Sequence, residues 1–368
     1  MSKTPKLESA IKKHQQGLLT DAKALYEELI YDEPNNADAL HLLGILLGQS
    51  QESAKAKDYL TKALSIDPNN ATFHNSMGNI CKQLHETLDA ISHYKTAIKL
   101  KPLSLTAYNN LAILFSTLHR FDEAISFAEQ ALKIDPSNSD AHFNLAMLKL
   151  KQNEPHEAIR ELRMSLHLDP YHTEAHYALA QQLQLIDEHE NAIKEYRQVI
   201  KRLPHFADAH VNLGASLLAT NNPDEAKAEF KRALDIDAKH SEAHFNLGCI
   251  LLEQRELKAA LAHFVQASAE EPTADTFYNI GVIYQYQDHY QDSIRYLKKA
   301  LELEPAHFGA LNNLATGYLK MQDLPKAIEY FEATLTLQPD NTEIAYILHA
   351  LKQDAIPERP PQNYIEHL

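Results

Sequence analysis

Five histidines recur in this sequence at spacings that are multiples of 34 residues, and histidine is a common metal ligand. They are His74, His142, His176, His210 and His244. A zinc ion needs several ligand atoms about 2.1 Å away at once, whereas equivalent positions on stacked helices lie about 10 Å apart. We therefore expect these rings to pack within the structure rather than bind metal, although their titration near neutral pH could give a mild pH response.

Other patterns that carry chemistry are absent from the sequence. It contains no P-loop, no glycine-rich dinucleotide fingerprint, no GxSxG elbow and no HExxH motif. Most of its nine glycines recur where helices would pack, which leaves none for a phosphate cradle. We therefore expect no catalytic residue, no cofactor and no metal site, and we predict that this chain is not an enzyme by itself.

The charge balance narrows the class of partner. The sequence has 35 lysines and arginines against 50 acidic residues, a net charge of -15, so its field repels phosphate backbones and anionic lipid headgroups. The N-terminal segment lacks an apolar signal region, and no uncharged apolar run approaches the ~20 residues needed to span a bilayer. Cys81 and Cys249 form no CxxC pair, which suits a reducing compartment. These features predict a cytoplasmic protein that binds neither nucleic acid nor membranes.

A period of 34 residues organises the sequence. One column is proline, with Ala238 in one register and one step shortened to 33 residues: Pro34, Pro68, Pro102, Pro136, Pro170, Pro204, Pro272, Pro305 and Pro339. A second column is always glycine or alanine: Ala10, Gly44, Gly78, Ala112, Ala146, Ala180, Gly214, Gly248, Gly281 and Ala315. A third is also small throughout: Ala22, Ala56, Ala90, Ala124, Ala158, Ala192, Ala226, Ala260, Ser293 and Ala327.

These columns predict pairs of antiparallel helices. Small residues that face one another allow two helices to approach at the short end of the ~8–10 Å interaxial range. The turn between the helices carries residues that tolerate a left-handed backbone, or histidine in the same column: Gly17, His85, His119, Asn153, Asp187, Asn221 and Asp288. The second helix ends near the proline, which cannot continue it.

The columns resemble those of the tetratricopeptide repeat (TPR) family, whose motif has small residues at positions 8, 20 and 27 and proline at position 32. This register gives ten repeats over residues 1–341, beginning near residues 3, 37, 71, 105, 139, 173, 207, 241, 274 and 308. We expect a capping helix over 342–354 and a proline-rich tail or truncated linker over 355–368. The resemblance implies an all-α fold, a right-handed superhelical α-solenoid of about ten helical hairpins plus a C-terminal capping helix.

In this family the first helix of each repeat lines a concave binding groove, into which positions 2, 5, 6, 9 and 13 point. Position 6 is asparagine in six repeats: Asn110, Asn144, Asn212, Asn246, Asn279 and Asn313. This column resembles the asparagine ladder of O-linked N-acetylglucosamine transferases, and it implies that the amides pair with the backbone of an extended peptide. The alternative is that these amides satisfy local backbone groups or bond between adjacent repeats.

Aromatic residues accompany the ladder. Position 5 contributes Phe143, Tyr177, Phe245 and Tyr278. The aromatic density is highest in the ninth repeat, where Tyr278 and Tyr286 fall on the groove face. An exposed apolar strip of this kind marks an interaction surface, and the alternative is that part of it packs against neighbouring helices.

These positions define the expected partner. Positions 2, 5 and 6 carry no lysine or arginine in repeats two to ten, which excludes the carboxylate clamp of chaperone-binding family members. We predict a protein-protein interaction scaffold that binds a protein or peptide segment, extended and neutral to basic, in the concave groove. Self-association through the terminal hairpins or the groove is an alternative.

The C-terminal segment suggests a second function. The run from Ala350 through Pro357, Pro360, Pro361, Tyr364 and Leu368 resembles the junction in bacterial proteins where such repeats precede an S-adenosylmethionine-dependent methyltransferase domain. The resemblance implies that the chain is the substrate-recruiting N-terminal part of a methyltransferase whose catalytic domain is absent from this sequence. The alternative is a flexible C-terminal tail.

Overall fold

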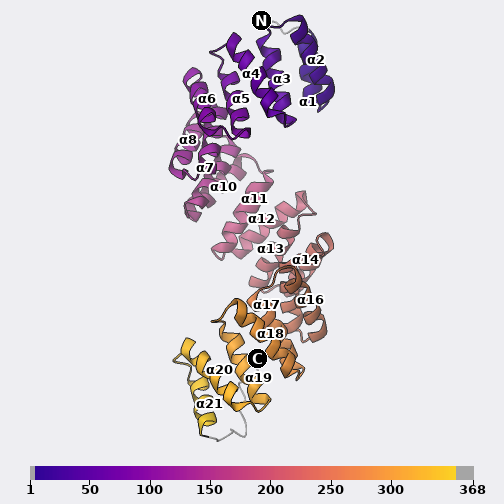
Figure 1. The fold of residues 1–368 in the computed structure, drawn as a ribbon, viewed down its shortest axis with the longest axis vertical. Helices are drawn as coiled ribbons and strands as arrows, with labels where there is room; N and C mark the ends of the chain where they lie inside the picture. The colour runs from indigo at the N-terminus through magenta and orange to yellow at the C-terminus, as the bar shows by residue number, and fades with distance from the viewer. Residues whose placement is uncertain (1–4, 354–368) are drawn as a thin grey trace. The chain divides into compact units, whose positions relative to one another are not determined.

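The structure, a computed structural model, describes residues 5–353 and is built from α-helices (Figure 1). Within this range there are 21 helices of 11 to 14 residues and no strand. In the same part of the chain, no helix has the length and apolar character needed to cross a membrane.

The chain divides into two compact units at Ala175 and His176. The helices of the first unit are α1 (Pro5–Gln15), α2 (Leu19–Asp32), α3 (Ala37–Gln49), α4 (Ser53–Ile66), α5 (Ala71–Gln83), α6 (Thr87–Leu100), α7 (Leu105–Thr117), α8 (Phe121–Ile134), α9 (Ser139–Lys151) and α10 (Pro155–Leu168). The boundary falls within α11 (Thr173–Leu185). The second unit continues with α12 (His189–Arg202), α13 (Ala207–Ala219), α14 (Pro223–Ile236), α15 (Ser241–Glu253), α16 (Leu257–Glu270), α17 (Ala274–Tyr286), α18 (Tyr290–Leu303), α19 (Phe308–Lys320), α20 (Leu324–Leu337) and α21 (Thr342–Lys352).

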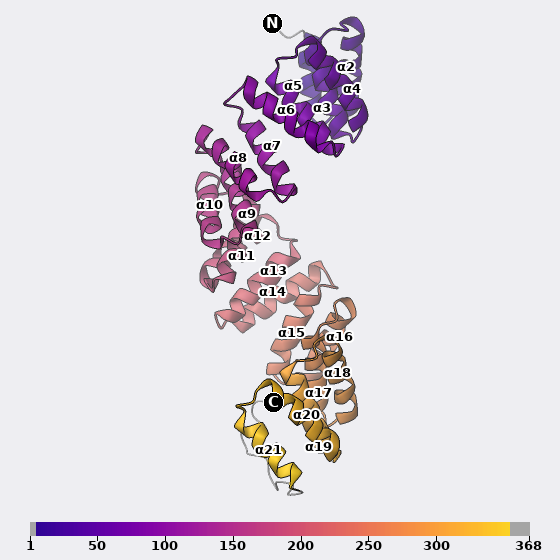
Figure 2. The same cartoon turned by 60° about the vertical axis from the view of Figure 1, so that its left-hand side comes forward.

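Within each unit the helices pair in chain order (Figures 1 and 2). An odd-numbered helix packs most extensively on the even-numbered helix that follows it, and that helix packs on the next odd-numbered one. The last helix, α21, packs on α20. The arrangement is the all-α solenoid of helical hairpins, ending in a single helix, that the sequence predicts.

The turns within the hairpins use a left-handed backbone. All the residues predicted for this column have positive φ, from His119 at 57° to Gly17 at 76°. Gln51, Arg255 and Gln322 adopt the same conformation, with φ of 62°, 60° and 62°, although their side chains do not favour it. Because the same short turn joins two closely packed helices in every hairpin, the packing determines the backbone there.

Small residues at position 8 make room for a bulky residue on the second helix. A Cβ added to Gly214 would lie 2.6 Å from the ring of Phe230, and one added to Gly248 would lie 2.9 Å from Phe264. Both rings are fully buried. The sequence predicts that the small residue faces another small residue. It does approach position 20, since a Cβ on Gly44 would lie 3.3 Å from a backbone oxygen there. Its closest neighbour, however, is the large side chain at position 24.

The residue before several odd-numbered helices caps the helix, a feature that the proline and small-residue columns do not predict. In four cases an asparagine side chain accepts a backbone N–H of the first turn: Asn36, Asn70, Asn138 and Asn341. His240 and His307 do the same with Nδ1. Such caps are each worth about 1 kcal/mol, and they fix where the odd-numbered helices begin.

Candidate functional site

In the second unit, the predicted contact residues lie on five odd-numbered helices, and those other than Asn313 on α19 lie on four of them. We call the following set the second-unit face: Tyr177 on α11, Asn212 on α13, Phe245 and Asn246 on α15, and Tyr278, Asn279 and Tyr286 on α17. Each of these side chains is half-buried. They therefore combine fixed positions with some access to solvent.

Some ladder asparagines tie neighbouring repeats together. Asn212 donates from Nδ2 to the hydroxyl of Tyr177 over 3.0 Å. In the first unit, Asn110 donates to Oδ1 of Asn75 over 3.0 Å. Both bonds join position 6 of one repeat to position 5 of the repeat before it. For these two asparagines, the alternative of bonding between adjacent repeats describes the structure.

For two other ladder asparagines, position 5 of the preceding repeat is an apolar residue, and no hydrogen bond to that position forms in the part of the chain that the structure describes. Val211 precedes Asn246 by one repeat, and Phe245 precedes Asn279. Among the described residues, none is hydrogen-bonded to the Asn246 side chain, and Asn279 donates only to the carbonyl of Asp275 in its own helix, over 2.9 Å. These two amides keep donors and acceptors that a partner could use.

Asn313 differs from the other ladder members because it is buried, at 1 % exposure. It lies beside Tyr278, whose ring packs against His307 with the centroids 4.9 Å apart. Burial raises the pKa of Tyr278, and the hydrogen-bonding influence of Asn313 opposes that shift. The prediction that Asn313 offers its amide to a partner does not fit this burial, so we leave it out of the site proposed below.

The aromatic side chains of the face are held by their own neighbours. Phe245 makes an edge-to-face contact with Phe264, with the centroids 5.7 Å apart. The guanidinium carbon of Arg255 lies 4.4 Å from the ring centroid of Tyr286, a cation–π geometry. Phe245 and Tyr286 are thus oriented while they remain partly accessible.

Carboxylates surround this face. Burial raises the pKa of Tyr177, and the negative charges of Asp208 and Glu242 raise it further. Burial likewise raises the pKa of Cys249 to about 12, with Glu253 and Asp275 adding to the shift. The local potential at the second-unit face is therefore negative.

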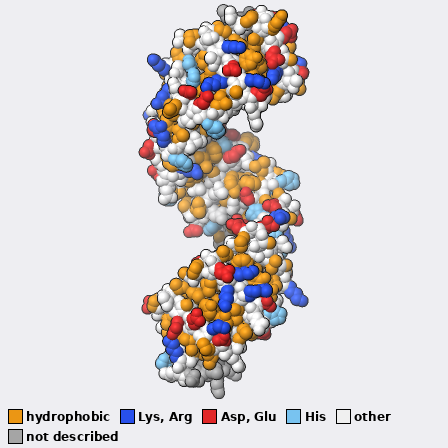
Figure 3. All heavy atoms as spheres, viewed as in Figure 1, with side chains coloured by type: hydrophobic (Ala, Val, Ile, Leu, Met, Phe, Trp, Pro, Cys, Tyr) orange, Lys and Arg blue, Asp and Glu red, His pale blue; other side chains and the backbone are white. Residues whose placement is uncertain are grey.

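Two of these four carboxylates already have partners. Asp208 bonds to Nε2 of His240 over 3.0 Å, and Asp275 bonds to Nε2 of His307 over 3.1 Å. Within residues 5–353, neither Glu242 nor Glu253 forms an ion pair, and both are exposed. More widely, acidic and basic side chains are interspersed on the visible surface (Figure 3). Glu242 and Glu253 are the carboxylates that could meet a cation here.

The first unit has a smaller site of its own. Asn144 and Met147 on α9 line a cleft of about 210 Å³ together with residues of α7, including Ile113 and Ser116. Phe143 stacks obliquely on His172, with the centroids 4.7 Å apart. Asn144 is the ladder residue that faces an open space in this unit.

The recurring histidines are bonded within their hairpins. Nδ1 of the ring meets the residue 19 positions later in five pairs: His74 with His93, His142 with Glu161, His176 with Glu195, His210 with Glu229, and His244 with His263. Nε2 also bonds to a backbone carbonyl six residues earlier in His74, His142, His210 and His244. The sequence contains a signal for these pairs. Where the first residue is one of these histidines, the residue 19 positions later is histidine or glutamate.

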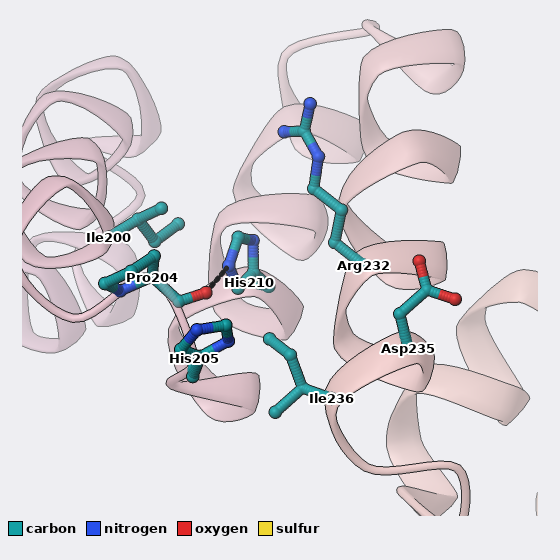
Figure 4. Close-up of a pocket in the computed structure, with 7 residues that line it drawn as sticks. All are labelled: Ile200, Pro204, His205, His210, Arg232, Asp235 and Ile236. Atoms are coloured by element: carbon teal, nitrogen blue, oxygen red, sulfur yellow. Dashed lines mark hydrogen bonds between the residues drawn. The ribbon is translucent and has the colours of Figure 1, made fainter.

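A larger cavity of about 690 Å³ lies in the second unit between α12, the turn that follows it, α13 and α14 (Figure 4). Its lining is Ile200, Pro204, His205, His210, Arg232, Asp235 and Ile236. His210 donates from Nε2 to the Pro204 carbonyl beside it, and residues of α14 form the opposite wall. None of the predicted contact residues lines this cavity.

The chain matches models of the family described as tetratricopeptide repeat over residues 37–70, 69–137, 117–183, 187–247, 274–307 and 308–341. A curated relative is the tetratricopeptide repeat domain-containing protein PYG7, chloroplastic, of Arabidopsis thaliana. It is 32% identical over 72 residues, 20% of this chain and 24% of that protein. The chain thus matches about a quarter of that relative's length.

Solved structures of similar fold include two repeat proteins. YrrB, described as a TPR protein with an unusual peptide-binding site, is 23% identical with a TM-score of 0.45, covering 54% of this chain and 97% of that one. A chain of the APC/C hetero-tetramer Cut9-Hcn1 is 16% identical with a TM-score of 0.50, covering 93% and 95%. The latter shows likeness of fold alone. The family matches, which extend over most of the sequence, show that this chain belongs to the tetratricopeptide repeat family.

Proposed function

We propose that this chain is a protein-interaction scaffold whose second-unit face binds an extended segment of another protein. The observation that carries the proposal is the pair of amides, Asn246 and Asn279, that lack the tie between repeats. They lie on neighbouring odd-numbered helices with the half-exposed rings of Phe245 and Tyr286. Membership in a repeat family without catalytic motifs supports the general role of a scaffold.

The chemistry of the face matches an extended backbone. A side-chain amide has two donor hydrogens and an acceptor oxygen, and an extended peptide leaves its own N–H and C=O groups unpaired. Each such hydrogen bond contributes about 1 kcal/mol net. Apolar side chains of the ligand would pack on Phe245, which adds affinity without strict sequence selection.

The charges support a partner segment that is neutral to basic. Glu242 and Glu253 are exposed carboxylates without an ion pair in the described residues, and the chain as a whole has a net charge of -15. A lysine or arginine of the ligand could reach one of these carboxylates at the edge of the face. The overall negative field would also speed the association of a basic segment.

A peptide selection tests this function. Random 12-residue peptides displayed on phage would be selected on the full chain, and the dissociation constants of synthetic copies measured by fluorescence anisotropy. We expect basic and apolar residues to be enriched in the selected peptides. A double variant with Asn246→Ala and Asn279→Ala should bind about 30-fold more weakly, because two hydrogen bonds of about 1 kcal/mol each are lost.

Asn191→Ala provides the matched control. Asn191 lies on the even-numbered helix α12 and bonds to Glu188 over 2.9 Å, so its loss should leave the dissociation constant unchanged. Circular dichroism would check that both variants keep their helix content. If the peptides bind the double variant as tightly as the wild type, the two amides do not contribute to binding. Enrichment of acidic peptides would contradict the prediction that the partner segment is neutral to basic.

Two alternatives stay predictions. The methyltransferase hypothesis depends on residues 350–368, of which 354–368 lie outside the described residues. Self-association through the terminal hairpins or the face can be separated from peptide binding by sedimentation velocity at several concentrations. A sedimentation coefficient that rises with concentration would favour it.

A further inference from the structure

The α15–α16 hairpin contains two histidines whose hydrogen bonds limit how many protons they hold. Nε2 of His244 lies 3.1 Å from the carbonyl oxygen of Ala238, and because that oxygen only accepts, Nε2 carries a hydrogen. Nδ1 of His244 lies 2.8 Å from Nδ1 of His263, so one of these atoms donates and the other accepts. With both rings neutral, a single hydrogen between the two Nδ1 atoms satisfies the pair.

Protonation of both rings is incompatible with this contact. One added proton can go to Nε2 of His263, but a second would place two N–H groups against each other. In the unfolded chain each ring is free to bind its proton near pH ~6.5. Burial, the neighbouring His244 and the ammonium of Lys231 on α14 all lower the pKa of His263. The open hairpin therefore binds more protons than the closed one in mild acid.

Among the residues that the structure describes, none of the charges that act on His263 offsets this limit on protonation. Asp237 and Lys239 flank the carbonyl that His244 contacts, but the Asp237 carboxylate accepts the backbone N–H of Lys239, and the Lys239 side chain pairs with Glu270 of α16. In the described part of the chain, no carboxylate forms an ion pair with either ring. The charges that act on His263 are those of His244 and Lys231, and both oppose further protonation.

The neighbouring hairpins are built differently at the same positions. In α13–α14, Nδ1 of His210 meets the carboxylate of Glu229 at 2.6 Å, and Nε2 donates to a carbonyl, so this site is satisfied by a doubly protonated ring. In α17–α18, Phe277 and Tyr296 face each other with centroids 6.2 Å apart and have nothing to titrate in mild acid. Only the middle hairpin of these three has the histidine pair.

We propose that the α15–α16 hairpin is an acid-labile segment of the scaffold, which opens locally as the pH falls below about 6.5 and thereby releases a segment bound to the face. The second half of this statement rests on the function proposed above, because Phe245 and Asn246 are on α15. If opening takes up one extra proton, the opening equilibrium constant rises by up to about tenfold for each pH unit below that value. The flanking hairpins stay closed over the same range.

Hydrogen–deuterium exchange of the full chain between pH 7.5 and 5.5 tests the opening without any partner. After correction for the intrinsic exchange rates, we expect protection of the α15 and α16 amides to fall about tenfold over the acid half of this range. Protection in α13–α14 and α17–α18 should stay constant. Equal changes in all three hairpins, or no change in α15–α16, would overturn the proposal.

Two variants keep the test decisive. His263→Glu copies the pairing of His210 with Glu229, and it should abolish the acid-dependent loss of protection. If that variant fails to fold, His244→Phe combined with His263→Tyr copies the pair of Phe277 and Tyr296 and should also remove the pH dependence. Acid-dependent opening that persists when the histidines are gone would contradict the assignment.

The binding half has its own readout. The selected 12-residue peptide with the best affinity at pH 7.5 would be titrated against wild type and His263→Glu at pH 7.5 and 5.5. We expect its dissociation constant to rise about tenfold in acid for the wild type only. If exchange changes as expected but no peptide binds at either pH, the proposed function fails while the switch stands. If peptides bind equally at both pH values and exchange does not change, the switch fails and the scaffold stands.

Discussion

The hairpins α13–α14 and α15–α16 show how one residue can change the chemistry of a repeat without changing its fold. In both, a glycine of the first helix packs beneath a fully buried phenylalanine of the second. Both have a histidine whose Nε2 bonds to the turn before the first helix, over 3.1 Å in each case. The helices have the same lengths, 13 and 14 residues.

The difference lies in the partner of the histidine, which is Glu229 in one hairpin and His263 in the other. The Glu229 carboxylate can accept a hydrogen from Nδ1 of a doubly protonated ring, so a second proton on His210 does not place two N–H groups against each other. The histidine pair is complete with both rings neutral, and burial lowers the pKa of His263. Its contribution to stability is therefore present above about pH 6.5 and is lost as the pH falls below that value. The packing of the hairpin therefore depends on the glycine and phenylalanine positions, whereas its response to pH depends on the histidine and its partner.

The largest expected effect tests what the two hairpins share. Phe230→Ala and Phe264→Ala each remove a fully buried ring, and each should cost about 4 kcal/mol of the free energy of opening its hairpin. Hydrogen exchange at pH 7.5 would measure both values. A difference between them of more than about 2 kcal/mol would show that the two cores are not equivalent.

The next largest effect concerns the partners of the two histidines, Glu229 and His263, at neutral pH. Glu229 is buried at 4 % exposure and bonds both His210 and the exposed Arg232, so Glu229→Ala leaves the buried His210 ring without its acceptor and should cost about 3 kcal/mol. His263→Ala removes one neutral hydrogen bond and should cost about 1 kcal/mol. Exchange in the two variants at pH 7.5 gives both values. A larger loss for His263→Ala would reverse the comparison.

A reciprocal exchange of partners should move the acid response to the other hairpin. Glu229→His places a histidine opposite His210, and we expect α13–α14 to lose about 1.4 kcal/mol for each pH unit below about 6.5. The same exchange experiment between pH 7.5 and 5.5 measures this slope. A Glu229→His protein whose α13–α14 hairpin keeps its wild-type pH profile would show that the histidine pair does not determine acid lability.

The smallest expected effect concerns where the two hairpins begin. His240 caps α15 through Nδ1, whereas α13 starts after Phe206, whose side chain makes no capping hydrogen bond. His240→Ala should destabilise the start of α15 by about 1 kcal/mol, and Phe206→Ala should leave the capping of α13 unaffected. Exchange of the first-turn amides measures both changes. No loss of protection in the His240→Ala variant would exclude a role for this cap.

The fold was predictable from the sequence because its signals are local and repeated. Proline and small-residue columns identify the hairpins, and the residues predicted for the turns have positive φ. Arg255 also has positive φ, at 60°, and its residue type gives no hint of this. There the tertiary packing of the two helices overrides the local preference.

The site was less predictable, because the state of each amide depends on a residue one repeat away. Asn212 and Asn246 look alike in the sequence. The Tyr177 hydroxyl accepts a hydrogen bond from Asn212, however, whereas the apolar Val211 cannot bond to Asn246. Reading the columns of positions 5 and 6 together would have separated these cases. The burial of Asn313 depends on how the helices pack, and no column of the sequence reports it.

The central claim is that partners bind to the second-unit face, and a cross-linking measurement tests it most directly. The photo-reactive residue p-benzoylphenylalanine would replace Phe245 on α15 in one protein and the exposed Val265 on α16 in another, and each would be irradiated with the best selected peptide. We predict a cross-linked product from position 245 and none from position 265. Cross-linking from position 265 alone would place the peptide on the even-numbered helices and contradict the account.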